Sequence, residues 1–167
     1  MIDTLKRLLP RAQERIPALA ELMPPDGYVL VTLHRPSNVD EPETLREIMR
    51  ALLKISQNVP VIFTVHPRTT PRFQSQARLV ITDSGGVQEE TTYLGVPCLT
   101  VRPNTERPVT IELGTNRLVA STCQSIVEAS APVLANGMQR GAGKGDRPEL
   151  WDGISSQRIV SVLREVL

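Results

Sequence analysis

The chain has 167 residues, with 19 basic and 18 acidic side chains and a net charge of +1. This near balance argues against binding to nucleic acid or to a membrane surface, and the length is enough for a domain with a sizeable core. No apolar run approaches the ~20 residues that span a bilayer. The N-terminal segment is amphipathic and lacks the apolar core of a signal peptide, so we expect a cytoplasmic protein.

Two further counts limit the chemistry. Aromatic residues make up only 3% of the sequence, so the core must be aliphatic. The only cysteines, Cys98 and Cys123, lack the spacing of metal ligands. We therefore expect ordinary thiols and no metal site.

Hydrophobic periodicity predicts helices and strands that alternate along the chain. Helices are predicted at residues 5–22 (interrupted at Pro10 and Pro17), 42–56, 87–94, 123–134 and 155–167. Strands are predicted at residues 28–33, 59–65, 78–82, 97–101 and 117–120. The strands are largely apolar along their length, as in parallel sheets covered on both faces. The expected fold class is therefore α/β, a doubly wound, Rossmann-like parallel sheet.

One connection does not fit this pattern. Residues 66–77 join two predicted strands but contain Pro67 and Pro71, which leave no room for a stable helix. A parallel crossover usually contains a helix that covers the sheet. We therefore expect a strand and most of a helix to be missing near residues 72–76.

The segment from Asp83 to Pro108, DSGGVQEETTYLGVPCLTVRPNTERP, follows the apolar run LVIT. A strand, a Ser-Gly-Gly turn and a helix follow one another, an arrangement that holds phosphates in many nucleotide-binding proteins. Gly85 and Gly86 let the backbone approach an anion, the Ser84 hydroxyl adds a donor, and Glu90 could accept bonds from a ribose diol. The same pattern also fits a tight strand-to-helix turn with a solvated glutamate.

Both histidines directly follow predicted strands. His34 comes after YVLVTL and His66 after VIFTV. Ligands of open parallel sheets bind beyond the C-terminal ends of the strands, on the same rim as Ser84. Either ring could donate to a phosphate or hold a sugar hydroxyl. Arg35 and Arg107 add guanidinium groups suited to anions. The alternatives are structural histidines and solvated loop arginines.

These residues resemble the C-terminal half of the non-hydrolysing UDP-N-acetylglucosamine 2-epimerases. The matching stretches are VTLHRPSNVD (31–40), VHPRT (65–69), ARLVITDSGGVQEETTYLGVPCLTVRPNTERPVTIELGTNRLV (77–119) and RPELWDGISSQRIVSVL (147–163). The resemblance implies a domain like the C-terminal one of the two-domain GT-B architecture. It also implies that residues 1–27 form a linker helix to an absent N-terminal domain, and that residues 28–167 bind a nucleotide sugar.

The resemblance further implies a reaction, the interconversion of UDP-N-acetylglucosamine and UDP-N-acetylmannosamine by elimination and re-addition of UDP. No metal or nicotinamide cofactor takes part, and members of the family are homodimers. Ser84 and the amides of Gly85 and Gly86 would hold the diphosphate, with Glu90 at the ribose. His34 matches a catalytic histidine, His66 a position near the nucleotide sugar, and Arg107 belongs to the matching TERP motif.

Two departures from the family pattern modify these expectations. The N-terminal half, which carries most of the family's proton-transfer carboxylates, is absent. The missing strand is an edge strand, so the sheet would keep the order 2-1-4-5-6 with an exposed edge and an uncovered face. We therefore expect an epimerase fragment that is inactive alone. A UDP-binding module, a non-functional truncated product and a GT-B glycosyltransferase are the alternative interpretations.

Overall fold

A single parallel sheet organises the molecule. The computed structural model describes residues 2–14, 23–64, 74, 76–135 and 148–166. The strands are β1 (Val29–Thr32), β2 (Val61–Phe63), β3 (Leu79–Thr82), β4 (Cys98–Val101) and β5 (Asn116–Val119). They lie in the order β2-β1-β3-β4-β5, and every neighbouring pair is parallel. This confirms the doubly wound α/β fold and the strand order predicted for a sheet without its outer strand.

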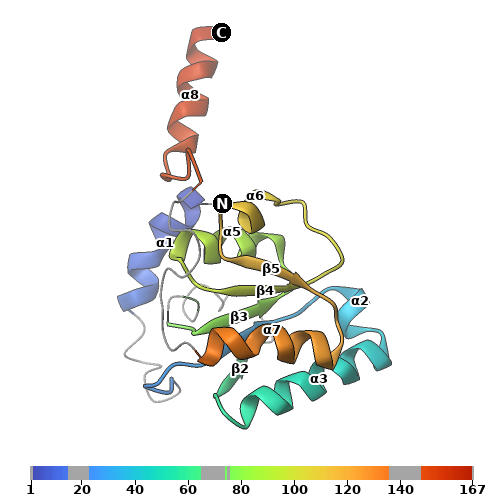
Figure 1. Cartoon of the computed structure of the whole chain (residues 1–167). Coiled ribbons are helices and arrows are strands. Elements are labelled where there is room, and N and C mark those ends of the chain that lie inside the picture. Colours follow the sequence, from blue (N-terminus) through green and yellow to red (C-terminus); the bar gives the residue numbers. More distant parts are fainter. Residues whose placement is uncertain (1, 15–22, 65–73, 75, 136–147, 167) are drawn as a thin grey trace.

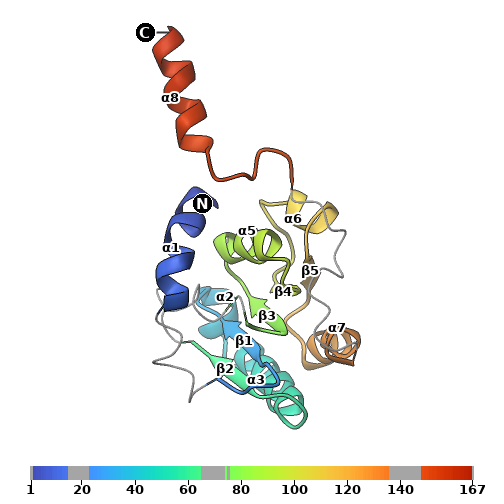
Figure 2. The same cartoon turned by 90° about the vertical axis from the view of Figure 1, so that its left-hand side faces the viewer.

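Helices cover both faces of the sheet (Figures 1 and 2). Those described are α1 (Ile2–Glu14), α2 (Pro36–Val39), α3 (Pro42–Ser56), α5 (Gly85–Leu94), α6 (Val109–Glu112), α7 (Cys123–Ala135) and α8 (Ser155–Val166). Helices α3 and α7 lie together on one face, and α5 and α1 lie on the other. Among the described residues, no helix is long and apolar enough to cross a membrane.

The core is aliphatic, as the composition predicts, and the sheet divides it in two. On one side, Val31, Ile81 and Leu99 of the sheet pack with Ile48 of α3 and Ile126 of α7. The smaller cluster on the opposite side contains Tyr28, Leu30, Val80, Val87 and Cys98. Strands β1, β3 and β4 are buried at every position, whereas the edge strand β2 is only half-buried and ends at exposed Phe63. The apolar runs in the sequence therefore mark the centre of the sheet.

Several predicted boundaries are corrected. Helix α1 begins at Ile2 rather than at residue 5 and continues through Pro10 to Glu14. Helix α5 begins at Gly85, so the Gly pair forms its first turn instead of preceding it. The one-turn helices α2 and α6 were not predicted. Pro17, Val65 and the proline-containing connection up to residue 73 lie outside the described residues.

The end of α5 explains how the chain returns to the sheet. Gly95 adopts a left-handed conformation (φ 68°), and its N–H bonds to carbonyls of the last helical turn. A residue with a Cβ is strained in this conformation, and glycine is the usual solution. Val96 then donates to the Thr91 carbonyl at 2.9 Å, and β4 begins two residues later at Cys98. This tight turn fixes α5 against the sheet and thereby sets the position of its N-terminus.

Helix α8 differs from the other long helices because it projects away from the sheet (Figures 1 and 2). None of its described residues is buried. Its first turn is tied to α1, since the Asp3 carboxylate accepts hydrogen bonds from the backbone N–H (2.9 Å) and the hydroxyl (2.7 Å) of Ser156. Helix α1 itself packs on the body through buried Ile2 and Leu5.

Candidate functional site

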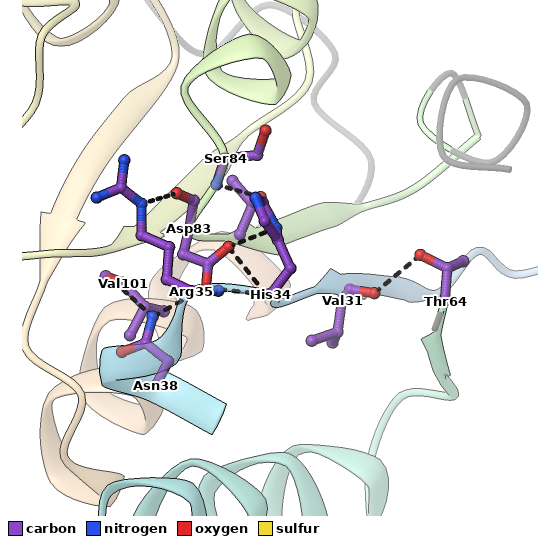
Figure 3. Close-up of polar contacts among 9 residues, drawn as sticks. Val31, His34, Arg35, Asn38, Thr64, Asp83, Ser84 and Val101 are labelled. Atoms are coloured by element: carbon purple, nitrogen blue, oxygen red, sulfur yellow. Dashed lines mark hydrogen bonds and ion pairs between the residues drawn. The ribbon is translucent and has the colours of Figure 1, made fainter. Parts of the chain in front are cut away.

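Candidate residues from two strands meet at the C-terminal edge of the sheet (Figure 3). Strands β1 and β3 are neighbours in a register that places Thr32 beside Thr82. The chain leaves β1 through His34 and Arg35 and leaves β3 through Asp83 and Ser84, so these four residues lie together. The predicted convergence of His34 and Ser84 on one rim is thus observed. His66 falls outside the described residues.

The Asp83 carboxylate links the residues of this rim to one another (Figure 3). Its side chain is fully buried and lies 2.9 Å (Oδ1) from Nδ1 of His34. The backbone N–H groups of His34 and Arg35 and the Nδ2 amide of Asn38 also donate to the carboxylate. We predicted no role for Asp83 from the sequence. The available signal was an acidic residue directly after a largely apolar strand, where burial requires partners for the charge.

The start of α5 has the properties expected of an anion site. Ser84 is the N-cap in an extended conformation, and its hydroxyl makes no capping bond. An ideal Cβ on Gly85 would meet only one atom within 4 Å, a carboxylate oxygen of Glu106 at 3.9 Å. The space in front of this backbone is therefore open. Free N–H groups at the first turn of a ten-residue helix favour negative charge there.

Charged side chains from two loops surround this opening. Arg35 donates through Nε to the Asp83 carbonyl at 3.2 Å, and its guanidinium lies 3.8 Å from Glu106. Buried Arg102 binds Glu106 through two hydrogen bonds of 2.9 and 2.6 Å. These bonds are the main reason that the pKa of Glu106 is lowered to about 2. An anion entering here would thus meet Arg35 but also one ionised carboxylate.

Two further predicted binding residues, Arg107 and Glu90, already have partners within the chain. Arg107 pairs with Glu89 of α5 at 2.9 Å and is 44% exposed. Glu90 accepts a hydrogen bond of 2.9 Å from the Gln74 amide. Burial is the largest influence on Glu90 and raises the pKa of its carboxyl group. Glu90 therefore lies in a largely buried environment, beside Gln74.

A hollow of about 470 Å³ adjoins the rim on the β4–β5 side. Ser37, Asn38, Arg102 and Ser121 line it together with the ends of β4 and β5. Its volume is within the range of small-molecule sites. Among the described residues, no group of three His, Cys, Asp or Glu side chains could hold a metal ion. Both cysteines are buried and free.

Comparison with known proteins relates the chain to one family. The chain matches the family model described as UDP-N-acetylglucosamine 2-epimerase over residues 1–75 and 70–164. It is 34% identical over 169 residues to a UDP-N-acetylglucosamine 2-epimerase of Methanocaldococcus jannaschii, covering 83% of this chain and 44% of that protein. A UDP-2,3-diacetamido-2,3-dideoxy-D-glucuronate 2-epimerase of Pseudomonas aeruginosa is also 34% identical, over 166 residues, with 84% and 45% coverage.

Solved structures show the same relationship. The Methanocaldococcus jannaschii epimerase in complex with UDP-GlcNAc and UDP superposes with a TM-score of 0.78 at 31% identity, over 98% of this chain and 52% of that one. The chain thus spans about half the length of the relatives that it matches. The two matches to the family model meet at residues 70–75, where the sequence predicts a missing strand and helix. By the extent of the family match and by its fold, this chain belongs to the UDP-N-acetylglucosamine 2-epimerase family.

Proposed function

We propose that this chain is the nucleotide-sugar-binding part of a UDP-N-acetylglucosamine 2-epimerase, and that it holds UDP at the start of α5. The observation that carries the proposal is the open backbone at Gly85. There the Ser84 hydroxyl makes no capping bond, and an added Cβ would meet only one neighbouring atom within 4 Å. A diphosphate fits such a position because it can accept bonds from the free amides and interacts favourably with the helix dipole.

The cations around the opening would complete the diphosphate site. Arg35 is fixed by the Asp83 carbonyl, and its terminal N–H groups, which lie only within 3.8 Å of Glu106, can donate to a ligand. Arg107 would have to leave Glu89 or share it, since the two are already paired. Glu106 opposes the ligand charge, and it is held by Arg102. We therefore assign the larger cationic contribution to Arg35.

The ribose contact proposed for Glu90 requires an exchange of partners. A ribose diol would compete with the Gln74 amide for the same carboxylate. Burial favours the neutral form of this carboxyl group, whereas an acceptor for a diol should be ionised. The Glu90 contact is therefore expected to add specificity for ribose more than overall affinity.

The reaction itself makes a further demand. As the bond between the sugar and UDP breaks, negative charge grows on UDP, and preorganised amides and cations would stabilise it. Removal of the proton at C2 needs a base, with an acid on the other face. Among the described residues of the rim, of α5 and of the loop after β4, the carboxylates of Asp83, Glu89, Glu90 and Glu106 all have partners. His34 is then the proton-transfer group that this chain supplies, and we propose that the chain alone does not complete the reaction.

The substrate class follows from the relatives. Two similar proteins are named for UDP-N-acetylglucosamine and for a UDP-2,3-diacetamido sugar acid. Both sugars combine UDP with an acetamido group at C2, the carbon that the 2-epimerases invert. We therefore propose a UDP-2-acetamido sugar as ligand, with UDP-N-acetylglucosamine as the first choice. The homodimer implied by the resemblance stays a prediction, which sedimentation analysis of the chain would test.

Titration calorimetry with UDP tests the binding site. Gly85→Ala should fold normally, because the added methyl group meets no close neighbour, yet it should weaken UDP binding about tenfold by blocking the phosphate. Ser84→Ala should weaken binding by about 1 kcal/mol, the value of one neutral hydrogen bond. Ser56→Ala, at the far end of α3, is the matched control. Unchanged affinity in both site variants would show that UDP does not bind here.

An activity assay separates the proposal from its alternatives. Incubation of the chain with UDP-N-acetylglucosamine should yield no UDP-N-acetylmannosamine, although UDP binds. Turnover would contradict the inactivity of the isolated chain. Absence of UDP binding up to millimolar concentration would favour a non-functional product. Transfer of the sugar to an acceptor would favour a glycosyltransferase.

A further inference from the structure

The Asp83 carboxylate is a buried charge whose partners all come from one short stretch of chain. It accepts from the backbone N–H of His34 (3.2 Å to Oδ1 and 3.1 Å to Oδ2) and from that of Arg35 (2.9 Å). The Asn38 amide donates to it at 3.0 Å and also to the Val101 carbonyl at 3.1 Å. These bonds supply the compensation that a fully buried carboxylate needs.

The pairing with the imidazole of His34 has a consequence for the ring itself. Nδ1 lies 2.9 Å from Oδ1 of Asp83, within hydrogen-bond distance. An ionised carboxylate can only accept, so this contact is favourable when Nδ1 carries the hydrogen. In the neutral ring the second nitrogen, Nε2, then has a free lone pair. The His34 side chain is 51% exposed while that of Asp83 is fully buried, so the ring is anchored on one side and accessible on the other.

The same residue also orients Arg35. Besides the bond from the Arg35 backbone to its carboxylate, Asp83 accepts at its main-chain oxygen from Nε of Arg35 at 3.2 Å. Figure 3 shows the two side chains, His34 and Arg35, on opposite sides of Asp83. One aspartate thus fixes the backbone of both residues, the ring of the first and the guanidinium of the second.

We propose that Asp83 is the positioning residue of this site, which holds His34 in the Nδ1–H form with Nε2 free to take a proton from a bound ligand. The statement about the ring does not depend on the ligand. The use of Nε2 in proton transfer rests on the proposed function above.

Nitrogen-15 NMR of the imidazole rings tests this directly on the whole chain. There are only two histidines, so His66→Gln leaves one ring spectrum to assign to His34. In the neutral ring, the nitrogen shifts should show the hydrogen on Nδ1. A hydrogen found mainly on Nε2 would overturn the proposal, whatever any variant does.

Two variants separate positioning from a general structural role. Asp83→Asn can present an amide N–H to Nδ1, so His34 should change to the Nε2–H form. Asn38→Ala removes another bond to the carboxylate but keeps the pair with His34, so the Nδ1–H form should persist. A ring form that is unchanged in folded Asp83→Asn would contradict the proposal. Should that variant not fold, the wild-type spectrum still decides.

A UDP titration of the same NMR sample keeps this proposal distinct from the proposed function. An Nδ1–H ring without UDP binding would remove the nucleotide site and leave the positioning role intact. UDP binding with an Nε2–H ring would keep the nucleotide site and remove the positioning role of Asp83. If both proposals hold, the ring is in the Nδ1–H form and UDP binds. Addition of UDP-N-acetylglucosamine should then shift the Nε2 resonance, while the hydrogen stays on Nδ1.

Discussion

Helices α3 and α8 have the same kind of sequence but opposite surroundings. Both are amphipathic, with apolar residues at helical spacing. In α3 the apolar face, formed by Ile48, Ala51, Leu52 and Ile55, is buried. In α8 the corresponding residues Ile159, Val160, Val162 and Leu163 are all between 46% and 59% exposed. The period of a sequence pattern thus identifies an apolar helix face, but it does not show whether the rest of the domain covers that face.

The difference comes from how each helix is attached. Helix α3 lies between β1 and β2, so the parallel connection returns it across the sheet face. Helix α8 follows β5 and α7 and does not connect two described strands. Its described contacts with the body are at its start, through Asp3 and Ser156. Chain topology, not hydrophobicity, therefore separates the two helices.

Truncating one isoleucine in each helix should give the largest difference. Ile48 is fully buried, so Ile48→Ala should lower the free energy of unfolding by about 2–5 kcal/mol through lost burial and a cavity. Ile159 is 59% exposed, and Ile159→Ala should change it by less than about 0.5 kcal/mol. Denaturant unfolding of both variants measures the effect. Equal losses would mean that α8 is covered in solution.

Two left-handed glycines extend the comparison to the turns. Gly95 closes α5 at φ 68°, and Gly153 precedes α8 at φ 75°. Gly95→Ala should destabilise the whole domain by about 1 kcal/mol, because a residue with a Cβ is strained there. Gly153→Ala is strained too, and the added Cβ would also displace the flexible Lys6 side chain of α1, but its effect should stay within α8 and its contact with α1. Hydrogen exchange would show this as faster exchange in α8 and unchanged protection in β1 and β3.

The smallest expected effect concerns acid. Hydrogen bonds from the backbone and hydroxyl of Ser156 lower the pKa of Asp3 from its usual 3.8 to about 2. A lowered pKa means that the ionised form stabilises the fold above pH 3.8 and that this contribution disappears as the pH falls through about 2. As the pH falls through this range, the amides at the start of α8 should therefore lose protection, measured as exchange relative to the unfolded chain at the same pH. Asp3→Asn should already show much of this loss of protection at neutral pH, whereas exposed Asp26→Asn should not.

The sheet was the most predictable part of the molecule. Runs such as LVIT (79–82) are largely apolar and are buried at every position, as in a strand covered on both faces. The observed strand order also agrees with the order expected if an outer strand is missing. Helices α2 and α6 have four residues each, which is too short for any periodicity to appear. The continuation of α1 through Pro10 was hidden because proline normally ends a helix.

The candidate site was predictable in its location but not in its internal bonds. His34 and Ser84 were expected on one rim because their strands end there. The role of Asp83 depends on the register that sets Thr32 beside Thr82 and on the ring orientation of His34, and neither is visible in a sequence. The partners of Glu90 and Arg107 were missed for a similar reason. Gln74 and Glu89 are single polar residues whose direction is decided by packing.

The spacing of the strands also has a consequence for how the domain folds. Along β3, β4 and β5, paired residues follow at equal intervals of 18, from Val80 to Cys98 to Asn116. Strand β1 instead meets β3 across 50 residues, from Val29 to Leu79. Loop-closure entropy makes the longer closure about 1 kcal/mol less favourable. We therefore expect the C-terminal three strands to associate first, so that substitutions in β4 slow refolding while those in β2 mainly speed unfolding.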